Sequence, residues 1–199
     1  MLTRESFLRT GAAAALGAAV APATALAALP TPAPVGDDEG YLQFAVLAER
    51  TSLAFYRQAR AMKRTWHAPE RTRLTQAIGQ KVAHVQRLNA VLGADAPAAS
   101  DFAVALPRQA FVTRGGALTL GRRLEGLLTG VYVGAVAFTA DPATRLLLGR
   151  LLANDAQQHA ALRVLAGMPA AAGLPDPVDL DTAGAELDRF LKSKGYPTS

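Results

Sequence analysis

The stretch LTLGRRLEGLLTGVY, residues 118–132, places a glutamate in the middle of an apolar helical face. Positions three or four apart lie on the same side of a helix, and that spacing groups Leu118, Gly121, Glu125, Leu128 and Tyr132. A carboxylate in the position of a core leucine is costly to bury unless a partner group neutralises it. Glu125 therefore predicts a charged site inside a helical domain.

Three other predicted helices repeat this feature, each with polar or charged residues at the centre of an apolar stripe. The stripes are Leu42, Ala45, Glu49, Ser52, Tyr56 and Ala59; Leu74, Ile78, Lys81, His84, Leu88 and Val91; and Leu148, Leu151, Asp155, Gln158 and Leu162. The fourth helix opens with Asp141-Pro142, a cap residue followed by proline at the first helical position. We expect the four central positions to meet in one core.

The connections predict the topology. Residues 94–116, which include Pro97 and Pro107, are too many for a turn between adjacent antiparallel helices, so this segment should cross over the bundle. No stretch shows the period-2 alternation of a strand. The predicted fold is all-α: an antiparallel four-helix bundle over residues 37–167 with a long crossover between helices two and three. In the tail, residues 168–199, a short helix over residues 183–192 should pack on the outside.

The N-terminal segment is typical of an export signal. Residues 1–27 carry Arg4 and Arg9, then an Ala-rich apolar run that ends in the small-residue cleavage pattern Ala25-Leu26-Ala27. Glu5 lies where a twin-arginine signal has its second arginine, so the Tat and Sec routes both stay open. An uncleaved membrane anchor is the alternative, although the run is short and Pro22 interrupts it. We expect an exported, periplasmic or extracytoplasmic protein with no stable membrane span after signal removal, and with a Pro-rich linker at residues 28–36.

Composition narrows the function classes. The chain has 199 residues, no cysteine and a formal net charge of +5, so any metal must be bound by nitrogen and oxygen ligands. The arginines are scattered at helical spacing, which indicates solvated helix faces and no nucleic-acid partner. The sequence identifies no other partner, and it leaves open whether the chain forms a homo-oligomer.

Three segments resemble one known family. Residues 41–45 (YLQFA), Glu125 with residues 131–135 (VYVGA), and residues 153–159 (ANDAQQH) are similar to exported bacterial ferritin-like domain proteins of the desiccation-related type. The resemblance implies a four-helix bundle with a Glu on helices one and three and a Glu-x-x-His motif on helices two and four. In such bundles these side chains hold two metal ions, typically iron or manganese.

The ligand pattern is only partly kept. Glu49, His84 and Glu125 match the family's terminal ligands, but Lys81 stands at the helix-two bridging position. On helix four we align Asp155-x-x-Gln158 with the motif. His159 then becomes a neighbour four residues after Asp155, and the other register would align Ala156-x-x-His159. The predicted metal ligands are Glu49, His84, Glu125, Asp155 and His159, with Lys81 and Gln158 at family ligand positions. His84 as a core histidine that makes only hydrogen bonds is the alternative to ligation.

The direction in which the Lys81 side chain points distinguishes the possible functions. Its four-carbon stem allows the ammonium to reach solvent. If it points inward instead, it needs carboxylate partners, and Glu49, Glu125 and Asp155 are the ones available; the ammonium would then take the place of one metal. The favoured function is an exported, non-catalytic structural or stress-related protein with a degenerate di-metal site. The alternatives are a protein with a single Fe, Mn or Zn site and an oxygen- or peroxide-activating, iron- or manganese-dependent oxidoreductase. Two ions, one ion and no metal all remain open.

Overall fold

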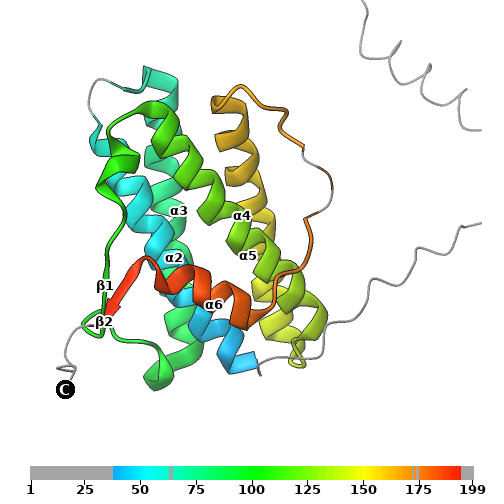
Figure 1. Ribbon diagram of the computed structural model, residues 1–199. Coiled ribbons are helices and arrows are strands. Elements are labelled where there is room, and N and C mark those ends of the chain that lie inside the picture. Colours follow the sequence, from blue (N-terminus) through cyan, green and yellow to red (C-terminus); the bar gives the residue numbers. More distant parts are fainter. Residues whose placement is uncertain (1–37, 63–64, 172, 174, 194–199) are drawn as a thin grey trace, which may run out of the picture. The chain divides into compact units, whose positions relative to one another are not determined.

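Four long helices form the body of the protein. The computed structural model describes residues 38–62, 65–171, 173 and 175–193; the predicted export signal (residues 1–27) and the predicted linker (residues 28–36) lie outside this part. Figure 1 shows α2 (Asp38–Ala61) and α3 (Ala68–Leu92) as one hairpin, and α4 (Arg114–Phe138) and α5 (Pro142–Leu165) as the second. The backbones of the two hairpins approach each other closely at α2 and α4, whereas those of α3 and α5 are farther apart and these two helices meet through longer side chains. The predicted all-α four-helix bundle is confirmed.

Local sequence explains where the helices begin. Thr113 caps α4 by accepting a hydrogen bond from the Gly116 amide, and Asp141 caps α5 by accepting one from the Thr144 amide. The first turn of α3 contains a proline, and the Glu70 carboxylate accepts a hydrogen bond from the His67 amide at 2.8 Å. Each cap satisfies backbone N–H groups that have no partner inside the helix.

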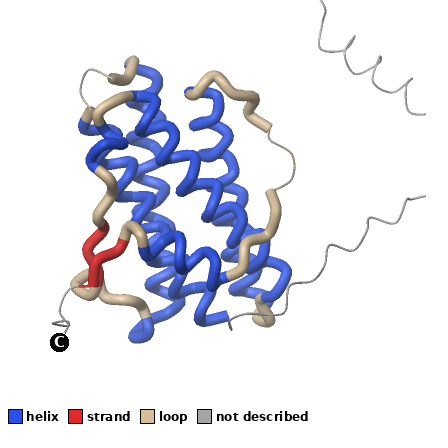
Figure 2. The backbone as a smooth tube through the Cα atoms, viewed as in Figure 1, coloured by secondary structure: helices blue, strands red, loops and turns tan. Residues whose placement is uncertain are grey.

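The crossover between the hairpins contains short elements. It runs through the 3-10 helix Gly93–Asp95, the strand β1 (Phe102–Val104) and a second 3-10 helix, Arg108–Phe111. Strand β2 (Leu191–Ser193) pairs antiparallel with β1, so that Val104 lies opposite Leu191. The two strands form the small ribbon at the side of the helices in Figure 2.

The C-terminal helix is confirmed, with different bounds. The structure places α6 at Leu180–Asp188 rather than at residues 183–192, and residues 191–193 are the strand that pairs with the crossover. The expectation that the chain contains no strand was wrong, because three-residue strands are too short to show a period-2 pattern. Val91 was also expected in the core but is 51 % exposed, because Leu88 and Leu92 fill the buried positions at that end of α3.

The buried interior is divided into two apolar layers. One contains Tyr41, Ala45, Leu88, Leu128, Tyr132 and Leu148, and the other contains Phe55, Tyr56, Leu74, Leu124 and Leu162. Each of the four long helices contributes residues to both layers, and its polar residues lie between the two contributions. The change of layer comes after Ala48 on α2, between Ala77 and Leu88 on α3, between Leu124 and Leu128 on α4, and after Leu151 on α5. The polar side chains therefore form a layer of their own at mid-height. Among the described helices, none is long and apolar enough to cross a membrane.

Candidate functional site

The polar layer is built by one charged group from each helix. Glu49 comes from α2, Lys81 from α3, Glu125 from α4 and Asp155 from α5, and all four are fully buried. His84 is one helical turn from Lys81 on α3 and its side chain is 12 % exposed. The stripes predicted from the sequence therefore converge on one site.

Lys81 lies at the centre of this layer. Its Nζ atom is 2.8 Å from Asp155 Oδ1, 3.0 Å from Glu49 Oε2 and 3.2 Å from Glu125 Oε2. It donates hydrogen bonds to Asp155 and Glu125, whereas the contact with Glu49 Oε2 is an ion pair without hydrogen-bond geometry. The inward orientation and all three predicted carboxylate partners of Lys81 are confirmed. The solvent-facing alternative is wrong, because the whole side chain is enclosed by the bundle.

Neighbouring side chains fix the carboxylates. Ser52 donates a hydrogen bond to Glu125 Oε1. The Tyr132 hydroxyl donates to Glu49 Oε1 over 2.9 Å, and His84 Nδ1 lies 3.1 Å from the same oxygen. These contacts come from α2, α3 and α4, so they tie the two hairpins together at the level of the site.

The carboxyl groups differ in their affinity for protons. Burial alone would raise the pKa of Glu49, but Lys81 and His84 together lower it to about 2. Burial raises the pKa of Glu125 and, more strongly, that of Asp155, and Lys81 only partly opposes this. The three carboxylates raise the pKa of Lys81 against the effect of its burial. The favoured state is thus one ammonium with one firmly ionised carboxylate, Glu49, while Glu125 and Asp155 retain protons more readily.

A family model identifies the fold independently. The model of the ferritin-like domain matches residues 37–168, which include all four bundle helices. This protein belongs to the ferritin-like domain family. No curated protein matches the chain by sequence.

Part of this ferritin-like domain could hold a metal ion. One ligand atom each from Glu49, His84 and Asp155 lie within 4.8 Å of one another. Carboxylate oxygen and imidazole nitrogen are ligands that iron, manganese and zinc accept. Lys81 Nζ contacts two members of this group, so an ion there would share its carboxylates with an ammonium.

Glu125 and His159, the other two predicted metal ligands, do not belong to this group of three. Glu125 reaches the cluster through Lys81 and Ser52. His159 is half-buried beside α4, where a methyl group added at Gly126 would be 3.5 Å from its ring. Gln158 donates to Gln80 and to Asn154, at the seam between α3 and α5. Of the two possible registers on α5, the one that places Asp155 in the site is therefore the one the structure has.

Sequence reasoning placed Ser52 and Tyr132 on the correct stripes but gave them no role in the site. Ser52 is three residues after Glu49, and Tyr132 is seven after Glu125, so both spacings put them on the same faces as the glutamates. That periodicity was the available signal. The periodicity could not identify their hydrogen-bond partners, because these lie on a different helix. Ser52 of α2 donates to Glu125 of α4, and Tyr132 of α4 donates to Glu49 of α2.

Glu49 and Asp155, whose pKa values are shifted in opposite directions, give a matched pair of variants. At about pH 7, Glu49→Gln should lower the free energy of unfolding by roughly 3 kcal/mol, because the folded state then loses the carboxylate whose pKa is depressed. Asp155→Asn should cost clearly less, since the raised pKa of Asp155 means that folding favours its uncharged form. Urea unfolding of both variants measures the difference.

The sign of the pH dependence follows from the same shift. The stabilisation from Glu49 is fully present above its unfolded pKa of 4.5 and is lost as the pH falls through that value toward about 2. The stability gap between the wild type and Glu49→Gln should therefore close in acid. Equal losses in both variants, or a gap that does not change with pH, would contradict the assignment of Glu49 as the ionised partner.

Proposed function

We propose that this is an exported ferritin-like protein in which Lys81 replaces the metal pair, and that it has a non-catalytic structural or stress-related role. The observation that carries the proposal is the position of Lys81 Nζ, 2.8–3.2 Å from carboxylates on three other helices. An ammonium at that place supplies positive charge to a cluster of buried acids, which in a di-metal bundle is supplied by the ions.

Two metal ions do not fit the residues present. A ferritin-like di-metal site uses a Glu-x-x-His motif from each of two helices. Here the glutamate position of α3 is Lys81, and its charge would repel both cations. On α5 the histidine position of the motif is Gln158, whose amide nitrogen faces Gln80 and Asn154. The third candidate, an oxygen- or peroxide-activating oxidoreductase, depends on such a pair and has no observation in its favour.

Export is the other part of the proposal, and its support comes from residues 1–27, which lie outside the described part of the chain. Arg4 and Arg9, the apolar run that follows them and the A-x-A pattern together favour a cleaved signal. Expression of the full chain in a bacterial host with a C-terminal tag tests it. A product outside the cytoplasm whose N-terminus is near Ala28 is expected, and an unprocessed cytoplasmic chain would contradict it.

Thermal unfolding with and without metal tests the role of Lys81. A ligand that binds only the folded state at a hundred times its Kd adds about 2.7 kcal/mol, which corresponds to a rise in Tm of roughly 5–10 °C for a domain of this size. We expect the chelator-treated protein to show the same Tm with and without Fe²⁺, Mn²⁺ or Zn²⁺. A saturable rise would favour the second candidate below.

The second candidate function is a single-metal site, and the proximity of Glu49, His84 and Asp155 favours it. Such a site requires Lys81 to move away or to lose its proton, because the ion and the ammonium need the same carboxylates. One equivalent of bound metal that His84→Ala abolishes would establish this alternative. The same variant should leave Tm insensitive to metal, as in the wild type, if Lys81 is the cation of the site.

A further inference from the structure

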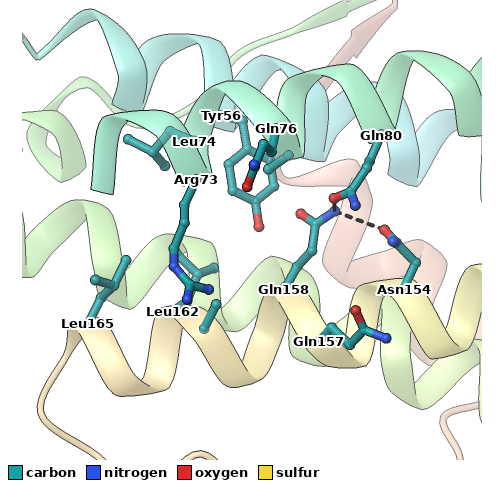
Figure 3. A pocket seen from close by; sticks show the side chains of 12 residues that line it. Tyr56, Arg73, Leu74, Gln76, Gln80, Asn154, Gln157, Gln158, Leu162 and Leu165 are labelled. Atoms are coloured by element: carbon teal, nitrogen blue, oxygen red, sulfur yellow. Dashed lines mark hydrogen bonds between the residues drawn. The ribbon is translucent and has the colours of Figure 1, made fainter. Parts of the chain in front are cut away.

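A pocket opens at the seam between α3 and α5. The backbones of these two helices make few close approaches, and a space of about 170 Å³ lies between them, with Tyr56 of α2 at its inner side. Figure 3 shows the side chains that face it. Gln80, Asn154, Gln157 and Gln158 gather at one end, while Leu74, Leu162, Leu165 and Arg73 lie at the other.

Two buried polar atoms have no hydrogen-bond partner at this pocket. Gln158 is 7 % exposed, and its amide nitrogen is used by Gln80 and Asn154, which leaves Gln158 Oε1 as a free acceptor. The Tyr56 hydroxyl points into the same space (Figure 3) and has no hydrogen bond of good geometry, although Glu125 is near it. A protonated tyrosine hydroxyl such as that of Tyr56 can donate one hydrogen bond. Unpartnered buried groups of this kind carry a desolvation cost that a bound polar group would remove.

Among the residues that line the pocket, Arg73 is the only one with a charged side chain; Glu125 lies near the Tyr56 hydroxyl but does not line the pocket. Arg73 extends from α3 toward Leu162 of α5 across the apolar end (Figure 3), and no lining residue is an acid. Within the described part of the chain, no carboxylate forms a salt bridge with Arg73. A guanidinium fork is well suited to a carboxylate. Cationic ligands and amino acids would find no acid for their ammonium group.

We propose that this pocket binds a small hydroxycarboxylate. The carboxylate pairs with Arg73. The hydroxyl accepts a hydrogen bond from the Tyr56 hydroxyl and donates one to Gln158 Oε1, which a single hydroxyl group can do at once. A space of about 170 Å³ suits a compound of a few carbon atoms rather than a sugar polymer or a peptide. No member of the Lys81 cluster lines the pocket, so ligand binding here and metal binding at the cluster are tested by separate measurements.

Calorimetric titration of the full chain with glycerate tests the proposal, with propionate and glycerol as the two partial ligands. Glycerate should bind with a Kd in the millimolar range or below, and each partial ligand should bind more weakly, because propionate lacks the hydroxyl and glycerol lacks the carboxylate. Tyr56→Phe removes only the hydroxyl and should weaken glycerate binding by about threefold to tenfold. Arg73→Gln should weaken it by roughly tenfold or more.

Arg87→Gln is the matched control, since Arg87 is exposed on the same helix and does not line the pocket. It should leave the affinity for glycerate unchanged. Unchanged binding by both Tyr56→Phe and Arg73→Gln, or equal affinity for glycerate and propionate, would overturn the proposal. A pocket that holds ordered water only, with no heat of binding from glycerate at millimolar concentration, would also overturn it.

Discussion

Replacement of Lys81 by methionine should lower the free energy of unfolding by about 3–5 kcal/mol, the loss expected when one partner of a buried ionic cluster is removed. Methionine is similar to lysine in length but leaves three enclosed carboxyl groups without a cation. Glu49 is most affected, because its pKa of about 2 depends on Lys81. Its charge then either remains buried and unpaired or is removed by taking up a proton, and both states cost stability.

Urea unfolding at about pH 7 measures this loss, and Lys192→Met serves as the control because Lys192 is exposed on β2. The double variant Lys81→Met with Glu49→Gln adds a second readout. Removal of the ionised carboxylate together with the ammonium should restore part of the stability, so the two losses should not add. A loss at Lys81 no larger than at Lys192, or strictly additive losses, would show that the ammonium does not neutralise Glu49.

The second large effect is expected when Lys81→Glu places a carboxylate three residues before His84. This restores the Glu-x-x-His spacing on α3 and leaves the site with four acids and no internal cation. The metal-free variant should be strongly destabilised by repulsion among buried carboxylates. Mn²⁺ or Fe²⁺ should then raise its Tm by roughly 5–10 °C at a hundred times the Kd.

Lys81→Gln is the control for this substitution, since glutamine removes the positive charge without adding a carboxylate that could bind metal. It should show no dependence of Tm on metal. The decisive comparison is between the two variants under the same metal concentrations. A Lys81→Glu protein that neither binds metal nor loses stability would mean that residue 81 does not lie inside the site.

The sequence was sufficient to locate the site because burial and helical periodicity act together. Glu49, Lys81, Glu125 and Asp155 each lie among apolar residues at three- and four-residue intervals, and such positions on the four helices of one bundle must face its interior. The same reasoning named all three partners of Lys81, since an enclosed ammonium needs nearby acids. The register on α5 also followed, because continuity of the helix favours Asp155 over its neighbour His159.

Other features depend on contacts that no local pattern records. The β1–β2 ribbon joins residues about ninety positions apart through backbone groups of three-residue strands, so it leaves no periodic trace. The bonds from Ser52 to Glu125 and from Tyr132 to Glu49 depend on how α2 and α4 pack. The pocket at the seam depends on the spacing of α3 and α5. From the sequence alone, its amide residues are indistinguishable from residues on a solvent-exposed helix face.

A crystal structure of the full chain grown with Mn²⁺, with diffraction data collected at the manganese absorption edge, tests the central claim most directly. The predicted result is Lys81 Nζ within hydrogen-bonding distance of the Glu125 and Asp155 carboxylates and beside Glu49, with no anomalous peak in the polar layer. An anomalous peak between Glu49, His84 and Asp155, with Lys81 turned away from them, would contradict it.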